Sequence, residues 1–80
     1  MFVTYVLRSL HDQKFYIGHT DDLKDRMRRH NEGRVPATKG RRPLVLIYSE
    51  EYPTKVEAVR RERYLKGLKG NWKFKQIIGV

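Results

Sequence analysis

Five side chains in this sequence have the types needed for chemistry on a phosphodiester: Tyr5, Tyr16, Arg26, His30 and Glu62. A glutamate can hold Mg²⁺ through its oxygen atoms, and an arginine can stabilise the negative charge that grows on phosphate oxygens. A tyrosine or a histidine can position or deprotonate the water that attacks phosphorus. A phosphodiester nuclease uses such a set of residues.

Each of these side chains also has an ordinary structural interpretation. A tyrosine in a strand usually packs with its hydroxyl in water, and an arginine on a basic helix can simply face solvent or phosphate. His30 lies where a helix C-terminus is expected, so it can be a partner of the helix dipole. Glu62 can pair with neighbours on its own helix, namely Arg61, Arg63 and Lys66. Taken singly, none of the five residues decides the function.

Two predicted strands position the tyrosines. Alternation over residues 2–9 puts Val3, Tyr5 and Leu7 on one face, and in the second strand, which begins at Phe15, Tyr16 faces away from the apolar side. A loop of two or four residues between the strands would place both tyrosines on the same face of an antiparallel pair. An unbulged loop of three or five residues would separate them.

A basic helix should follow the second strand directly. Thr20 is the expected N-cap, and the helix would run from Asp21 to about Asn31, ending before Gly33. Four residues of this helix fall at positions i, i+3, i+4 and i+7 of one face: Leu23, Arg26, Met27 and His30. Arg26 and His30 therefore flank an apolar anchor.

Residues 34–43 have no apolar periodicity and contain Pro, Gly and four cations, so they are predicted to form a basic loop. The continuous apolar run from Leu44 to Tyr48 is typical of a strand covered on both faces. It is predicted to be the central or best-buried strand and to end before Pro53.

A second helix is predicted to begin at Lys55, because Thr54 and Glu57 have the spacing of a capping box. Glu62 falls within the apolar stripe of this helix, between Ala58 and Leu65, and a carboxylate on a burying face needs an explanation. A final short helix is expected after the cap Asn71, with apolar weight from Trp72, Phe74, Ile77 and Ile78.

The composition limits the choice of partner. A chain of 80 residues suits one domain, residues 1–80, with a small core. The 18 Lys and Arg residues against 9 Asp and Glu give a net charge of +9, and the cations recur along the chain, which favours a nucleic acid as the partner. The absence of cysteine excludes a disulfide framework and a thiolate zinc site, and it fits a reducing compartment.

The apolar start of the chain does not have the pattern of a targeting segment. It lacks a basic start and is interrupted by Arg8, so it is better explained as a strand. We therefore expect no signal peptide, no membrane span and a cytoplasmic location.

The motif Y-I-G-x-T-x-x-L-x-x-R-x-x-x-H-N over residues 16–31, followed by A-x-x-x-E-x-x-L-K over residues 58–66, resembles the GIY-YIG nuclease superfamily, in particular its small single-domain members. The resemblance covers essentially the whole chain. It implies an α+β fold, a three-stranded antiparallel sheet flanked by helices in the order β-β-α-β-α-α. The implied activity is hydrolysis of phosphodiester bonds with Mg²⁺ or Mn²⁺, in DNA more often than in RNA.

The resemblance also implies roles for individual residues. Tyr5 and Tyr16 match the tyrosines of the two half-motifs, Arg26 matches the catalytic arginine, and Glu62 matches the metal-binding glutamate. His30 matches a histidine that some members use as a base or to support the tyrosine. Further residues are predicted to contact the substrate: Gly18, Thr20, Lys39, Arg41 and Arg42.

Two departures from the family pattern bear on activity. The first half-motif, Val3-Thr4-Tyr5, lacks the nominal glycine, and Asn71 is only a loose counterpart of an asparagine that some members use beyond the glutamate. The sequence predicts a metal-dependent endonuclease, with a catalytically inactive nucleic-acid-binding module or a ribosome-associated basic protein as alternatives. It leaves the physiological substrate and the oligomeric state open.

Overall fold

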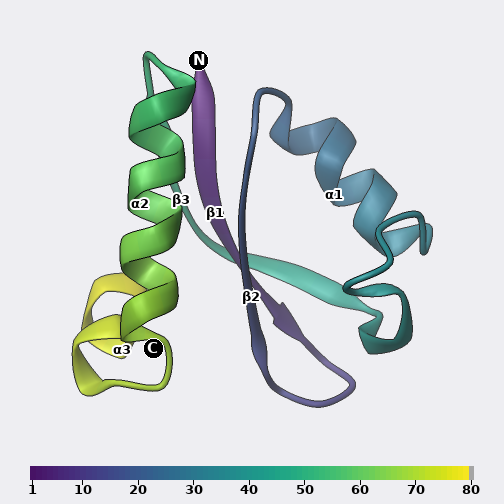
Figure 1. Ribbon diagram of the computed structural model, residues 1–80. Helices are drawn as coiled ribbons and strands as arrows, with labels where there is room; N and C mark the ends of the chain where they lie inside the picture. The colour runs from purple at the N-terminus through teal and green to yellow at the C-terminus, as the bar shows by residue number, and fades with distance from the viewer. Residues whose placement is uncertain (80) are drawn as a thin grey trace.

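A three-stranded antiparallel sheet separates one helix from two others in the computed structural model, which describes residues 1–79 (Figure 1). The elements follow in the order β1 (Phe2–Ser9), β2 (Phe15–Thr20), α1 (Leu23–Asn31), a 3₁₀ turn (Lys39–Arg41), β3 (Leu44–Tyr52), α2 (Lys55–Leu68) and α3 (Trp72–Ile78). The predicted α+β class and the order β-β-α-β-α-α are confirmed.

The central strand is β1, since the order across the sheet is β2-β1-β3. The prediction that Leu44–Tyr48 forms the central strand is therefore wrong: β3 is an edge strand, and it continues to Tyr52. Its apolar run has another cause, a register shift opposite Val6 and Leu7. A bulge inserts one extra residue and breaks the alternation of faces, so consecutive apolar residues do not mean that both faces are covered.

The hairpin of β1 and β2 places the two tyrosines on one face. Ser9 N–H donates to Lys14 O at 2.9 Å, closing a four-residue loop over residues 10–13. Tyr5 then lies opposite Gly18, and Leu7 lies opposite Tyr16, so the tyrosines are diagonal neighbours with ring centroids 6.4 Å apart. This confirms the prediction that a four-residue loop would bring them together.

Each face of the sheet has its own core cluster. On the side of α1, Tyr5, Leu7 and Leu44 are buried and are joined by Tyr16, Leu23 and Met27. On the side of α2 and α3, the buried residues are Val6, Ile17, Leu65, Phe74 and Ile78. Successive β1 residues therefore serve different layers, as strand geometry requires, and α1 is held apart from α2 by the sheet (Figure 1).

The start of α1 differs from the prediction. Asp22, and not Thr20, is the N-cap, because its Oδ1 accepts the Asp25 N–H at 3.0 Å. Thr20 Oγ1 accepts the Asp22 N–H at 3.1 Å and shapes the turn before the helix. Both residue types cap well, so the identity of the N-cap depends on where β2 ends and the helical backbone begins. Gly33 follows the helix with φ +78°, as predicted for its end.

The two C-terminal helices follow the predicted caps with one correction. Thr54 Oγ1 accepts the Glu57 N–H at 3.3 Å, and α2 begins at Lys55. Trp72 was predicted to add to the core, but it is 72% exposed, because α3 turns Phe74 and Ile78 toward the sheet, four residues apart on one face.

Replacing Gly18 should test the packing between the two strands. A Cβ at Gly18 would lie 2.6 Å from Tyr5 Oη and 2.8 Å from Tyr5 Cζ, so Gly18→Ala is expected to lower the free energy of unfolding by about 1–3 kcal/mol. Urea denaturation would measure it. Gly67→Ala is the matched control, since Gly67 lies in α2 with open space around it and alanine there should stabilise by about 0.5–1 kcal/mol. Equal effects of the two variants would contradict the packing role of Gly18.

Candidate active site around the edge of strand β2

Tyr5 and His30, both predicted to be catalytic residues, form a buried hydrogen-bonded pair. The Tyr5 hydroxyl lies 2.9 Å from His30 Nε2, and both side chains are 0% exposed. His30 Nδ1 lies 2.7 Å from Oγ1 of the buried Thr38, which donates to Val35 O at 3.5 Å. Thr38 therefore accepts from Nδ1–H, and Nε2 accepts the Tyr5 hydroxyl proton.

Both members of this pair are neutral near pH 7. Burial lowers the pKa of His30 to about 4, with a further contribution from the neighbouring Arg26 cation. Burial also raises the pKa of the Tyr5 phenol well above its ordinary value, and Tyr16 adds to the shift. In this conformation Tyr5 keeps its proton, and the pair holds the ring of Tyr5 in place. The catalytic roles of Tyr5 and His30 stay predictions.

Tyr16 and Arg26 lie next to this pair and are more accessible. The Tyr16 ring is half-buried, with its centroid 5.1 Å from the His30 ring. Arg26 is close enough to Tyr5 to oppose the rise in its pKa. Among residues 1–79, the buried Nε atom of Arg26 has no hydrogen-bond partner, and the same is true of Arg8 Nε. A buried guanidinium N–H without a partner is costly.

Glu62 lies on α2, and two cationic or polar side chains contact its carboxylate. Oε1 lies 2.6 Å from His19 Nδ1 and Oε2 lies 2.7 Å from Lys66 Nζ, while the side chain is only 14% exposed. Burial alone would raise the pKa of Glu62, but the hydrogen bonds from Lys66 and His19 outweigh it and keep the pKa below its usual range. The carboxylate is therefore ionised at neutral pH.

The site residues lie on two sides of one strand. Tyr5, Tyr16 and His30 belong to the face covered by α1, whereas His19 and Glu62 belong to the face covered by α2. In the part of the chain that the structure describes, no strand pairs with the outer edge of β2. A molecule lying along this edge, which lies between α1 and α2 in Figure 1, could contact both groups.

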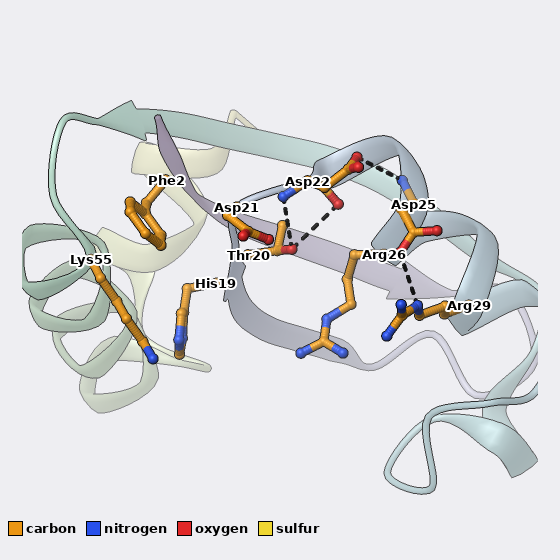
Figure 2. Close-up of a pocket in the computed structure, with 9 residues that line it drawn as sticks. All are labelled: Phe2, His19, Thr20, Asp21, Asp22, Asp25, Arg26, Arg29 and Lys55. Carbon is orange, nitrogen blue, oxygen red and sulfur yellow. Dashed lines mark hydrogen bonds and ion pairs between the residues drawn. The ribbon is translucent and has the colours of Figure 1, made fainter.

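A hollow of about 300 Å³ opens at the C-terminal end of β2, between α1 and the start of α2. Figure 2 shows the side chains of Arg26, His19 and Lys55 extending into the same region. Thr20 also lines it, consistent with its predicted place near the substrate. Asp21, Asp22 and Asp25 form its acidic rim, so the cations here face both solvent and carboxylates.

The other predicted substrate contacts have structural partners. Gly18 is buried beneath the Tyr5 ring. Arg41 Nε donates to Asp12 Oδ2 at 3.0 Å, and Arg42 Nε donates to Lys39 O at 2.8 Å. Of the cations predicted from residues 34–43, none lines the hollow that contains Arg26. Their contact with substrate stays a prediction.

Sequence reasoning missed two residues, His19 and Thr38. His19 stands between the motif residues Gly18 and Thr20, and only the packing of α2 on β2 shows that it reaches Glu62. Thr38 lies in a polar loop, where no periodic pattern marks a buried residue. Its partner is His30, eight residues earlier in the chain.

Comparison with known proteins shows the family of this chain. Residues 1–75 match the GIY-YIG catalytic domain. The chain belongs to the GIY-YIG family. Its similar proteins include UPF0213 protein YazA of Bacillus subtilis, which is 45% identical over 58 residues, covering 71% of this chain and 59% of YazA. The UPF0213 protein CPE1444 of Clostridium perfringens is 38% identical over 78 residues, covering 96% of this chain and 83% of the relative.

A solved structure shares the fold. The solution NMR structure of the UPF0213 protein BH0048 from Bacillus halodurans aligns with a TM-score of 0.59 at 32% identity, covering 96% of this chain and 83% of that one. This GIY-YIG chain thus spans most of some relatives and under two thirds of YazA. Among residues 1–79, no helix is both long and apolar enough to cross a bilayer.

The buried neutral His30 should make folding sensitive to acid. In the unfolded chain its pKa is near 6.5, and in the folded chain it is about 4. Its contribution to stability is therefore complete above pH 6.5 and is lost as the pH falls toward 4, because the unfolded chain takes up the proton first. We expect a loss on the order of 2 kcal/mol from this residue between pH 6.5 and 4.5, measured by urea denaturation.

His30→Gln should flatten the pH dependence of stability in this range, whatever its effect on stability at pH 7. His11→Gln is the matched control, since His11 is exposed and should leave the slope unchanged. An unchanged slope in His30→Gln would show that His30 does not titrate at a lowered pKa.

Proposed function

We propose that this GIY-YIG protein is a metal-dependent endonuclease that hydrolyses phosphodiester bonds in nucleic acid, and the family's usual activity favours DNA over RNA as the substrate. The observation that carries the proposal is the chemistry on the two sides of β2. One side presents Arg26, which lines the hollow at the end of β2 and whose buried Nε has no partner among residues 1–79. The other presents Glu62, an ionised and mostly buried carboxylate.

The residues present fit the divalent metal that the family implies. In residues 1–79 no group of three or more His, Cys, Asp or Glu side chains could hold an ion by itself. Mg²⁺ commonly binds proteins through one or two carboxylates and completes its coordination with water and phosphate oxygens. Glu62 would supply that carboxylate, with Lys66 and His19 as its exchangeable partners. When bound, Mg²⁺ or Mn²⁺ would place positive charge against the phosphate.

The protein's own residues then divide the remaining work. Arg26 would donate to a non-bridging phosphate oxygen and stabilise the charge that grows there as water attacks. Tyr16 would hold that water in line with phosphorus, since it is the more accessible of the two tyrosines. The Tyr5–His30 pair would hold in place the two rings against which the Tyr16 ring packs.

One observation favours the alternative of a binding module without catalysis. Both Glu62 oxygens already have partners, His19 and Lys66, so a metal ion must compete with them. A module of this kind would keep the basic surface and bind nucleic acid with strong salt dependence but would not respond to divalent metal.

Cleavage assays with matched variants distinguish these functions. The substrates are single-stranded, nicked, branched and duplex DNA, and RNA, each with Mg²⁺, with Mn²⁺ or with EDTA. We expect cleavage only with metal, and a loss of at least about 100-fold in rate for Glu62→Gln and for Arg26→Ala. Glu57→Gln and Arg28→Ala are the controls, because each is exposed on the same helix as its counterpart and should keep the wild-type rate.

Two results would contradict the nuclease. Cleavage that is equal in wild type, Glu62→Gln and Arg26→Ala would come from a contaminating enzyme. Salt-sensitive binding without metal-dependent cleavage of any substrate would assign the protein to the binding module.

A further inference from the structure

A second, larger hollow lies at the opposite end of β2 from Arg26. It has a volume of about 820 Å³ and lies between the β1–β2 loop and the C-terminal end of α2. Its cations are Lys14, Arg41, Lys66 and Lys69. Asp12 is its acidic residue, and Arg41 pairs with that carboxylate at 3.0 Å. The hollow therefore carries an excess of positive charge.

The cations of this hollow repel one another. Burial lowers the pKa of Lys69, and the charges of Arg41, Lys66 and Lys14 lower it further, while the charge of Asp12 opposes them. Bringing like charges together in a partly desolvated place costs free energy on folding. An anion in the hollow would reverse that cost by pairing with the ammonium groups.

Glu62 lies between the two hollows on a single face of α2. Lys55 lines the first hollow, and Lys66 and Lys69 line the second. Relative to Lys55, Glu62 and Lys66 follow at spacings of 7 and 11 residues, which are close to whole helical turns, and Lys69 is the C-cap of the helix. The proposed metal ligand is thus flanked by lysines in both directions along the helix.

The strand beneath this face has the same arrangement. His19 and Thr20 of β2 line the first hollow, and Phe15, with the preceding Lys14, lines the second. A strand of six residues spans about 20 Å, which corresponds to roughly six phosphates of one strand at about 3.4 Å each.

We propose that the Lys14–Lys69 hollow binds backbone phosphates of the nucleic acid that is cleaved at Glu62, so that the substrate follows the open edge of β2 from Arg26 to Lys69. Lysine ammonium groups contact phosphates without reading base sequence. The inference depends on the proposed function for its catalytic centre, but the contact itself does not require hydrolysis.

Binding without metal tests the inference separately from the nuclease. Fluorescence anisotropy in EDTA over a series of NaCl concentrations would compare wild type with the double variant Lys14→Ala/Lys69→Ala on a labelled 20-nucleotide duplex and its single strand. Lys66 and Arg41 stay unchanged, because Glu62 and Asp12 need them. Lys24→Ala/Lys75→Ala is the control, since it removes the same charge from exposed positions that line neither hollow.

The Lys14/Lys69 variant should bind at least 10-fold more weakly than the control at 0.1 M salt. The slope of log Kd against log salt should fall by about 1.4–1.8 relative to wild type, the value for two lost phosphate contacts. Equal weakening in the two variants would overturn the inference, and it would do so whether or not the wild type cleaves. Proof of folding by circular dichroism accompanies both variants.

A second arm separates nucleic acid from a free anion. Inorganic triphosphate is titrated into the ¹⁵N-labelled protein, following the Lys14 and Lys69 amide signals by NMR. If triphosphate saturates these signals at micromolar concentration while oligonucleotide affinity is the same in both double variants, the hollow is a site for a small polyphosphate and the inference fails. Millimolar or absent triphosphate binding, with selective loss of oligonucleotide affinity, supports it.

Discussion

The contact between the Tyr5 ring and Gly18 is the constraint on which the rest of the site depends. Tyr5 lies on the central strand and is fully buried, so its large side chain must find room on the α1 face of the sheet. Gly18, directly opposite on β2, supplies that room by having no side chain. The Tyr5 hydroxyl can then reach His30, which ties α1 to the sheet, and through His30 it reaches Thr38 in the following loop. One small residue therefore sets the position of a strand, a helix and a loop.

A second constraint comes from Glu62, whose charge lies on the burying face of α2. A carboxylate that is 14% exposed is costly without partners, and His19 and Lys66 provide them. These partners differ from a permanent structural ion pair such as Glu50 with Arg61, where Tyr52 also donates to the same carboxylate. Glu50 has its bonding capacity filled by three side chains, Tyr48 and Tyr52 of β3 and Arg61 of α2. Lys66, in contrast, is more than half exposed and can leave Glu62. Glu50 therefore stabilises the packing of β3 on α2, whereas the carboxylate of Glu62 remains open to a ligand.

Much of the fold was predictable because local signals were strong. The Thr54 cap, the glycine that ends α1 and the alternation in β1 each have a physical cause that acts within a few residues. The order of strands was not predictable in this way. Leu44–Tyr48 has the composition of a central strand, but β3 pairs with β1 alone and lies at the edge of the sheet, an arrangement set by pairing between distant segments. The same limit applies to the site: strand alternation correctly placed Tyr5 and Tyr16 on one face, whereas His19 meets Glu62 across 43 residues of sequence. Their contact arises only from tertiary packing.

The open edge of β2 has a consequence for the protein when it has no ligand. An unpaired strand edge presents backbone donors and acceptors that can pair with a strand from another molecule. Here the Lys14 end of the edge carries an excess of positive charge, so two copies that paired in parallel through this edge would bring like charges together. The cations that would attract phosphate thus also oppose this mode of self-association. At 0.1 M salt such repulsion is screened beyond about 10 Å, so this protection weakens at high ionic strength. The same side chains would therefore determine both the resistance to aggregation and the binding of phosphate.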